Sequence, residues 1–307
     1  MVRRMLTEGQ RRPLALCMLI ASSIALVAGC DGSPLEPPST SGVASTAEQQ
    51  PITVEVNQSR DQYGKQAIQI QLTNTTDTPL TVTGARLDSP LFDGGISWEP
   101  TAGTLELPPR QPKSLPASLP AADCRMAGDA SPAPIGATVR YAEPGGSPQD
   151  TATTAADPFG VLARNAGELC LAKEASAVAT IVLAPGLDVA ADGRTAVVRL
   201  LITPVAPSGA AQTLTIESIE ETTLLAEPPT EPWPTNVLIR SGADRQEIAL
   251  GIRPVRCDPH AVAEDKVGTL LPLRIKVGDR QGQLKIAAST ELRGRIYDFV
   301  TAACSGQ

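Results

Sequence analysis

The residues best suited to chemistry lie close together in the last quarter of the chain. The only histidine, His260, follows Asp258 and precedes Glu264 and Asp265. Carboxylate oxygens and an imidazole nitrogen are common ligands of divalent metal ions, so these four residues form a candidate metal site. The alternative, which we favour, is a solvent-exposed acidic loop. We therefore predict no bound metal and no other cofactor.

Sequence motifs of common enzyme classes are missing from the chain. It contains no G-x-S-x-G, no H-E-x-x-H and no GK[ST] loop. A nucleophilic triad would have to use His260, the one imidazole available. We predict no catalytic residues and no enzymatic activity. A hydrolase or a metal-dependent enzyme ranks third among the functional hypotheses.

Two tryptophans, Trp98 and Trp233, are the only ones in the chain, and each lies in a proline-containing connection. Exposed aromatic rings are favoured at recognition surfaces, which makes both residues candidate recognition sites. The alternative is that each ring packs against prolines at the end of a folded domain. Their matching positions in the two halves favour the packing role.

The first thirty residues carry the pattern of an export signal. An apolar run of 15 residues, from Leu14 to Ala28, is too short for a membrane span of ~20 residues. A basic segment precedes the run, and small residues follow it, as in secretory signals. The basic residues and the small-residue exit are Arg3, Arg4, Arg11, Arg12 and Val27-Ala28-Gly29-Cys30.

This order resembles the signal peptide of a bacterial lipoprotein, with residues 1–29 as the signal. The resemblance implies cleavage before Cys30 and a diacylglyceryl anchor on that cysteine. It places the protein at the outer, extracytoplasmic face of a bacterial cell membrane. An uncleaved signal anchor and cleavage by an ordinary signal peptidase are the alternatives.

Residues 30–51 are predicted to form a flexible tether. The stretch from Asp31 to Gln50 is rich in Ser, Thr and Pro and has no aromatic residue, so it buries too little surface to offset its ordering entropy. The full chain has 26 basic and 33 acidic residues, a net charge of −7, and loss of the signal changes this to −10. An acidic chain is a poor partner for nucleic acid or anionic lipid, so the lipid provides the only predicted membrane link.

Four cysteines remain after Cys17 and Cys30 are set aside. Four cysteines allow three pairings, but the spacings of 46 and 47 residues favour Cys124–Cys170 and Cys257–Cys304. Export permits disulfides, whereas the alternative is four free thiols. Two loops of nearly equal length predict one disulfide in each of two repeated units.

Apolar residues that alternate with polar ones recur in the same order in both halves, as expected of strands with one buried face. The matched sets are Ile68, Ile70, Leu72 with Val198, Leu200, Ile202; Leu80, Val82 with Leu214, Ile216; Leu115, Ala117, Leu119 with Ile248, Leu250, Ile252; and Ile135, Ala137, Val139, Tyr141 with Leu271, Leu273, Ile275, Val277.

The pattern predicts an all-β fold of two tandem domains, residues 52–173 and 174–307, each with one disulfide. A short helical turn is expected before each second cysteine. The arrangement resembles immunoglobulin-like (Ig-like) β-sandwiches, although no tryptophan lies between the paired cysteines in either unit.

Two functional hypotheses lead. The first is a membrane-anchored binding or interaction module whose partner is an unknown envelope protein or extracellular ligand, because loops on a rigid scaffold are free for recognition. The second is a structural or accessory envelope protein, a spacer or a partner subunit of a membrane complex. The all-β pattern argues against a solute-binding lipoprotein, whose lobes are normally α/β.

Overall fold

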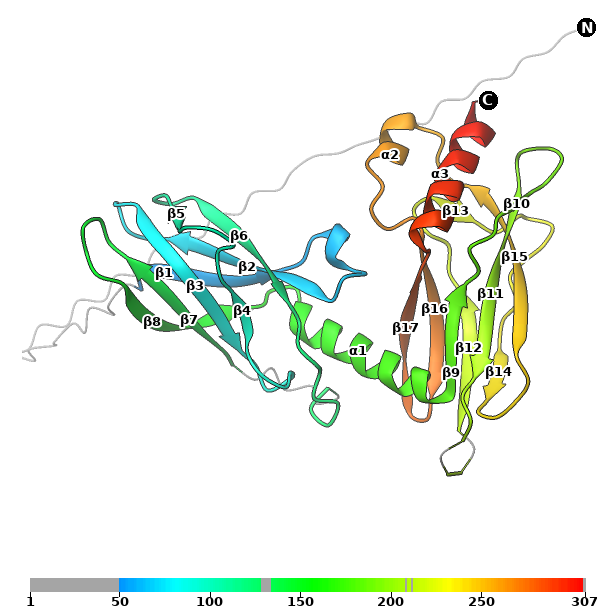
Figure 1. The fold of residues 1–307 in the computed structure, drawn as a ribbon, viewed down its shortest axis with the longest axis horizontal. Coiled ribbons are helices and arrows are strands. Elements are labelled where there is room, and N and C mark those ends of the chain that lie inside the picture. Colours follow the sequence, from blue (N-terminus) through cyan, green and yellow to red (C-terminus); the bar gives the residue numbers. More distant parts are fainter. Residues whose placement is uncertain (1–49, 128–133, 208, 211, 306–307) are drawn as a thin grey trace, which may run out of the picture. The chain divides into compact units, whose positions relative to one another are not determined.

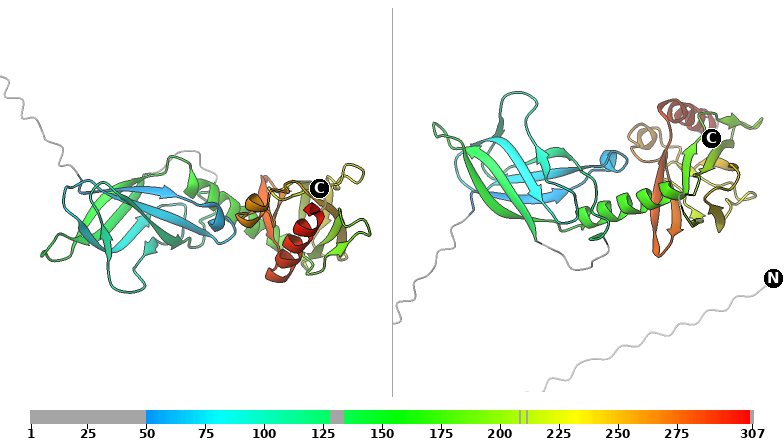
Figure 2. Two further views of the ribbon diagram at one scale, coloured as in Figure 1. Left: turned by 90° about the horizontal axis from the view of Figure 1, so that it is seen from above. Right: turned by 60° about the horizontal axis from the view of Figure 1, so that its bottom comes forward.

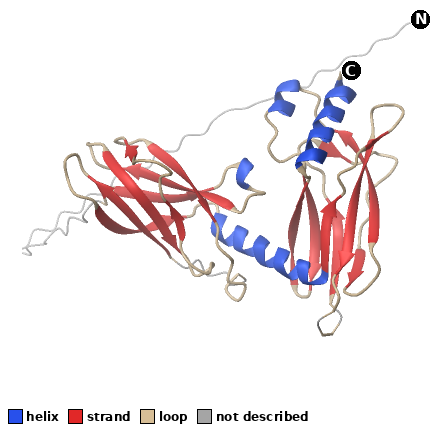
Figure 3. Ribbon diagram, viewed as in Figure 1, coloured by secondary structure: helices blue, strands red, loops and turns tan. Residues whose placement is uncertain are grey.

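The computed structural model describes residues 50–127, 134–207, 209–210 and 212–305 (Figure 1). The predicted signal peptide, Cys30 and nearly all of the predicted tether lie outside the described residues. Strands, red in Figure 3, dominate before and after the long helix α1, which confirms the predicted all-β class. Within the described ranges, no helix has the length and apolar character to cross a membrane.

Eight strands and a short 3-10 helix precede α1 (Val161–Val178). They are β1 (Ile52–Asn57), η1 (Arg60–Gln62), β2 (Ala67–Asn74), β3 (Leu80–Asp88), β4 (Ile96–Trp98), β5 (Leu105–Leu107), β6 (Pro112–Ser118), β7 (Ile135–Ala142) and β8 (Gln149–Ala156). They form one sheet in the order β4-β3-β7-β8-β1-β2-β6, with β5 paired to β3. A parallel pairing of β1 with β8 joins the strands β4-β3-β7-β8 to the strands β1-β2-β6.

Nine strands and two helices follow α1. They are β9 (Ala179–Leu183), β10 (Asp188–Val189), β11 (Ala196–Pro204), β12 (Thr213–Ile219), β13 (Leu225–Ala226), β14 (Val237–Arg240), β15 (Gln246–Pro254), α2 (Pro259–Ala263), β16 (Leu270–Val277), β17 (Arg280–Ala287) and α3 (Thr290–Cys304). One sheet has the order β10-β11-β15-β13, with β9 paired to β11, and another has the order β14-β12-β16-β17.

Two clusters of buried apolar side chains form the cores. The first gathers residues from β1 to the middle of α1 and ends at Cys170, and the second begins at Leu171 and extends to α3. Val, Ile, Leu and Ala supply most of both clusters, so many small contributions add up, each fully buried branched side chain contributing about 1.5–3 kcal/mol. The predicted domain boundary at residues 173/174 falls inside α1.

Antiparallel pairings found before α1 recur after it. β1–β2, β2–β6, β3–β7 and β7–β8 are paralleled by β9–β11, β11–β15, β12–β16 and β16–β17. Ile70 lies opposite Leu115, and Leu200 lies opposite Ile248. These four residues are matched in the sequence comparison, so that part of the predicted alignment agrees with the pairing.

One matched strand lies two residues from its expected position. A bulge interrupts the ladder after Val82 in β3 and after the matched Ile216 in β12. Val82 lies opposite Tyr141, whereas Ile216 lies opposite Ile275. Tyr141 therefore corresponds to Ile275 and not to Val277. A two-residue shift keeps every side chain on its own face, because strand side chains alternate with a period of two.

The helices are longer than the short turns expected before the second cysteines. α1 has 18 residues and continues past Cys170, and α3 has 15 residues and contains Cys304. Figure 2 shows α1 leading from β8 into β9 in two further views. Burial stabilises α1 on both sides of Cys170, whereas a single turn would gain no such packing.

Candidate functional site

A nearby carboxylate fixes the start of helix α1. Asp157 accepts hydrogen bonds from the backbone N–H groups of Val161 (2.7 Å) and Leu162 (2.9 Å). The first N–H groups of a helix lack intrahelical partners, and a negative charge there also interacts favourably with the helix dipole. Gly160, with φ of 59°, occupies the left-handed region that glycine adopts without Cβ strain. The first turn of α1 is therefore well defined.

Helix α1 belongs to both cores. Leu162 and Ala166 pack into the first cluster, and Leu171 and Val178 pack into the second. All four side chains are buried, with exposed fractions of 2% or less. Because no break separates the two sets, the helix physically links the first core to the second.

Both predicted disulfides are present: Cys124–Cys170 and Cys257–Cys304. The first ties the middle of α1 to the segment after β6. Arg280, at the start of β17, donates hydrogen bonds to the carbonyl oxygens of Cys124 (3.4 Å) and Ala127 (3.3 Å). Its guanidinium also pairs with Glu174 of α1 at 2.9 Å. The first disulfide thus holds a segment that the second half of the chain contacts.

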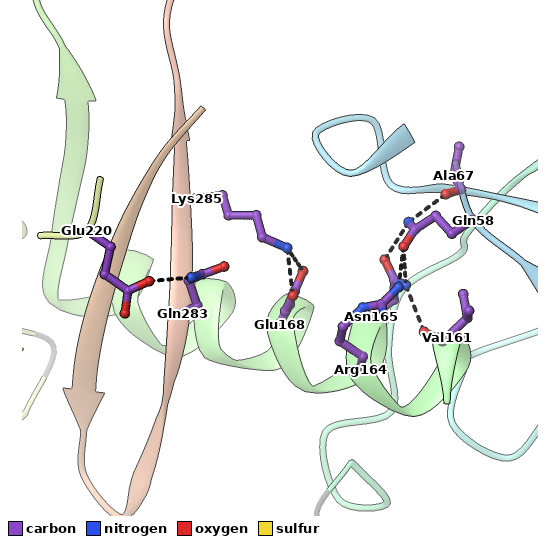
Figure 4. A network of polar contacts seen from close by, with 9 residues as sticks. All are labelled: Gln58, Ala67, Val161, Arg164, Asn165, Glu168, Glu220, Gln283 and Lys285. Carbon is purple, nitrogen blue, oxygen red and sulfur yellow. Dashed lines mark hydrogen bonds and ion pairs between the residues drawn. The ribbon is translucent and has the colours of Figure 1, made fainter. Parts of the chain in front are cut away.

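An ion pair joins α1 to β17 at the centre of the junction (Figure 4). The Lys285 ammonium donates to both carboxylate oxygens of Glu168, at 2.7 and 2.8 Å. The two side chains are 18% and 26% exposed, respectively. A pair this far from bulk water is screened less than a surface pair, so it ties β17 to the helix more firmly than an exposed pair would.

An amide network secures the other end of α1 (Figure 4). Gln58 donates to the carbonyl oxygen of Ala67 (2.9 Å) and to the side-chain oxygen of Asn165 (3.1 Å). The Asn165 amide nitrogen donates to the Val161 carbonyl at 2.7 Å, and Arg164 donates to Gln58 at 2.6 Å. Asn165 is only 6% exposed, so these bonds satisfy a buried amide that would otherwise destabilise the fold.

Tyr63 lies beside these charges, just after η1. The Lys285 ammonium is 5.2 Å from the centre of its ring, and the Arg164 guanidinium carbon is 5.6 Å from it. Cations within about 6 Å of a ring centre are attracted by its negative face. Tyr63 is 36% exposed, so one aromatic ring and two cations meet where solvent still reaches.

These residues line a cleft of about 330 Å³, which we call the junction cleft. Its polar wall includes Arg164, Glu168, Glu221, Gln283 and Lys285, with Tyr63 beside them. Its apolar wall includes Val267, Leu270 and Pro272. A smaller hollow of about 140 Å³ shares several of these residues. The volume is within the range of about 300–1,000 Å³ seen for ligand sites.

The four candidate metal residues, Asp258, His260, Glu264 and Asp265, line one hollow of about 360 Å³, but they are not placed as the ligands of one metal ion. Asp258 accepts a hydrogen bond from the backbone N–H of His260, whose ring nitrogen is 3.3 Å from Glu264. The Asp265 carboxylate accepts hydrogen bonds from the hydroxyl groups of Thr223 and Tyr297. In the part of the chain that the structure describes, no group of three or more His, Cys, Asp or Glu residues is placed to hold a metal ion.

The two tryptophans lie against the cores. Trp233 is 6% exposed, and its indole N–H donates to the Gly251 carbonyl at 2.6 Å. Trp98, in β4, is half-buried against the first cluster. Their burial agrees with the packing interpretation, and ligand recognition by either ring stays a prediction.

Sequence patterns did not indicate the residues of the junction cleft. Tyr63 belongs to none of the predicted strands, and Lys285 lies 117 residues from Glu168. The one usable signal was the helical spacing of Arg164 and Glu168, four residues apart and on one side of α1. That spacing identifies a helix face but not its neighbour.

Comparisons with known proteins give only distant similarity. No family model and no curated protein matches the chain. The YadV chaperone is similar over 76% of this chain and 97% of its own, with 13% identity and a TM-score of 0.21. The Amycolatopsis orientalis exo-chitosanase CsxA is similar over 76% of this chain and 26% of its own, with 13% identity and a TM-score of 0.20. Red sea bream transglutaminase has a TM-score of 0.19 at 9% identity, over 78% of this chain and 31% of its own. Similarity at these scores carries no argument about fold family or function.

Proposed function

We propose that the chain is an exported bacterial lipoprotein, anchored through Cys30 to the outer face of the cell membrane. The order of basic, apolar and small residues before Cys30 supports this assignment. The two disulfides also support it, because such bonds persist in oxidising compartments outside the cytoplasm. The two acyl chains of a diacylglyceryl group would hold the protein stably, whereas one chain binds marginally.

The proposal includes two tandem Ig-like β-sandwich domains, residues 52–173 and 174–307, on a flexible tether of residues 30–51. The recurring order of strand pairings supports a repeat, as does the single disulfide that reaches a helix in each half. A tether of this length and composition has a root-mean-square reach of roughly 25 Å. It would hold the domains away from the membrane surface.

The proposed activity is binding, with the junction cleft as the site. The observation that carries this proposal is the convergence of one aromatic ring and four charged side chains on that cleft. Glu168 and Lys285 neutralise each other, whereas Glu221 has neither a hydrogen bond nor an ion pair with any described residue. Arg164 donates one hydrogen bond to Gln58 and has further N–H groups. A ligand with both acceptor and donor groups fits, such as an extended segment of an envelope protein or extracellular peptide.

Site-specific photo-crosslinking tests the binding role. A benzophenone amino acid at position 63 should form a discrete adduct in native membranes, which mass spectrometry can identify. The same amino acid at Phe159, which is 70% exposed and does not line the cleft, is the matched control. Glu221→Lys should weaken the position-63 adduct about five-fold, because it reverses the charge offered to the partner. Equal adducts from both positions, or an adduct that Glu221→Lys leaves unchanged, would contradict the proposal.

A spacer or accessory role is the second candidate, and the continuity of α1 through both cores favours it. A spacer requires a fixed connection between its domains but no particular ligand in the cleft. It predicts that Glu221→Lys leaves any membrane complex intact, whereas the binding module predicts that Glu221→Lys weakens the complex. Blue-native electrophoresis of membranes from cells that express the wild-type chain or the Glu221→Lys variant distinguishes these outcomes.

A further inference from the structure

A second cleft, the terminal cleft, lies between α2 and α3 beside the Cys257–Cys304 disulfide. Its volume is about 480 Å³, within the range of about 300–1,000 Å³ typical of small-molecule sites. The disulfide, Pro259, Val262 and Ala263 form its accessible apolar lining, and the fully buried Val300 lies beneath them. The function proposed above does not use this cleft.

A tyrosine–aspartate pair forms one polar part of the lining and is internally satisfied. The Tyr297 hydroxyl donates to the Asp265 carboxylate at 3.0 Å. The same carboxylate accepts hydrogen bonds from the backbone N–H of Gly268 (2.8 Å) and from the Thr223 hydroxyl (2.7 Å). Burial, together with the Asp265 charge, raises the pKa of Tyr297 to about 12. The phenol therefore remains a donor to Asp265 at neutral pH.

The remaining polar side chains of the lining also have partners. Thr301 donates through its hydroxyl to the Tyr297 carbonyl at 2.8 Å, and Ser305 donates likewise to the Thr301 carbonyl at 2.7 Å. A charged ligand in this cleft would give up its water and find no ionic partner that is not already hydrogen-bonded. An apolar ligand would instead gain from covering the accessible apolar surface of Pro259, Val262 and Ala263. The lining therefore selects by polarity as well as by size.

We propose that the terminal cleft binds an uncharged apolar small molecule, such as a fatty acyl chain, between α2 and α3. The walls contact the hydrocarbon, and the satisfied polar groups disfavour a charged head inside the cleft. The chemistry is the same whether the acyl chain belongs to an external lipid or to the anchor on Cys30.

Probe binding to the full chain with Cys30→Ser tests the site independently of the proposed lipidation. Uncharged N-phenyl-1-naphthylamine should bind saturably, one per chain, with increased fluorescence and a higher melting temperature. The anionic analogue 8-anilinonaphthalene-1-sulfonate should bind about ten-fold more weakly, because it carries a charge into the cleft. A signal that does not saturate, or equal affinity for the two dyes, would overturn the proposal.

Matched substitutions locate the binding. Ala263→Trp fills the cleft and should weaken dye binding about ten-fold. Ala302→Trp, at an exposed position of α3 that does not line the cleft, should leave the affinity within about two-fold. Val262→Asp introduces a carboxylate into the lining and is the second variant if Ala263→Trp does not fold. Unchanged dye affinity in a folded cleft variant would place the dye elsewhere and refute the site.

The source of the ligand is identified by comparing dye binding to the Cys30→Ser chain with dye binding to the wild-type chain, and this comparison rests on the proposed lipidation of Cys30. Equal dye binding by the wild-type and Cys30→Ser chains assigns the site to an external apolar ligand. Binding by the Cys30→Ser chain alone assigns it to the protein's own acyl chains. Both results require the site itself, so failure of lipidation and failure of the site remain distinguishable.

Discussion

The two disulfides close loops of 46 and 47 residues, yet they reach helices that contact different surroundings. Cys170 is fully buried in the middle of α1, which continues to Val178. Cys304 is half-buried at the last residue of α3. Nearly equal sequence spacing has therefore produced two connections with unequal surroundings.

The length of the helix beyond the cysteine explains the difference. In α1 the extension buries Leu171 and Val178 in the second core, and Arg280 contacts the segment tied by the disulfide. Beside α3 the corresponding bond borders the terminal cleft. The first bond is part of a junction, and the second closes one end of a domain. Substitutions matched between the halves can sharpen or break this comparison.

Removing each disulfide should give the largest effects. Closing a loop of this length contributes about 4 kcal/mol in the chain-entropy model, so Cys257→Ala with Cys304→Ala should cost about that much in the free energy of unfolding. Cys124→Ala with Cys170→Ala should cost more, because it also frees the segment that Arg280 contacts. Urea unfolding measures both. A larger loss of stability from removing Cys257–Cys304 than from removing Cys124–Cys170 would contradict the comparison. An unchanged melting temperature in reductant would refute a stabilising role for either bond.

Leucines on the two halves of α1 test whether the helix couples the cores. Leu162→Ala removes packing from the first core and Leu171→Ala from the second, and each should cost about 3 kcal/mol. If α1 couples the cores, each variant lowers a single cooperative transition in calorimetry. Two separate transitions, with only one of them shifted by each variant, would show that the cores unfold independently.

The ion pair between α1 and β17 should contribute less. Glu168→Gln leaves the Lys285 ammonium without its charged partner, at 18% exposure of that side chain, and should cost about 1–2 kcal/mol. Asp77→Asn breaks a pair with Arg110 in which the side chains are 93% and 61% exposed, and should cost less than about 0.5 kcal/mol. Chemical denaturation at low and high salt checks the ranking, which equal losses would contradict.

Strands and disulfides were predictable because each follows a local rule. Ile68, Ile70 and Leu72 alternate with polar residues, and all three are fully buried on one face of β2. The cysteine spacings identified the pairing because the two loops are nearly equal. The two-residue error between Tyr141 and Val277 has a physical origin: a period of two is unchanged by a shift of two.

The length of α1 was not predictable from periodicity, because its buried face changes along the helix. Leu162 and Ala166 lie on the face toward the first core, and a new set begins at Leu171 for the second. Two partners acting on one helix blur the single stripe that marks an amphipathic helix. The junction cleft was hidden for a similar reason, since Glu168 and Lys285 meet only through the fold. Neither the packing of α1 against the second core nor the Glu168–Lys285 ion pair is encoded in a local sequence pattern.

A comparison of Tyr297 with Tyr141 at alkaline pH gives the smallest expected effect. Burial, followed by the Asp265 charge, raises the pKa of Tyr297 from 10.0 to about 12. The folded chain then keeps this proton while the unfolded chain loses it, so the stabilisation is complete below pH 10 and is lost as pH rises toward 12. Tyr297→Phe should flatten this loss of stability and remove the highest step from the ultraviolet titration of tyrosinate.

The matched control is Tyr141→Phe in the first half of the chain. Burial also raises the pKa of Tyr141, with the Glu143 charge as the lesser cause. Because Tyr297 donates a hydrogen bond to a carboxylate, its removal should affect the titration more than removal of Tyr141, and the reverse order would contradict the assigned environment of the terminal cleft.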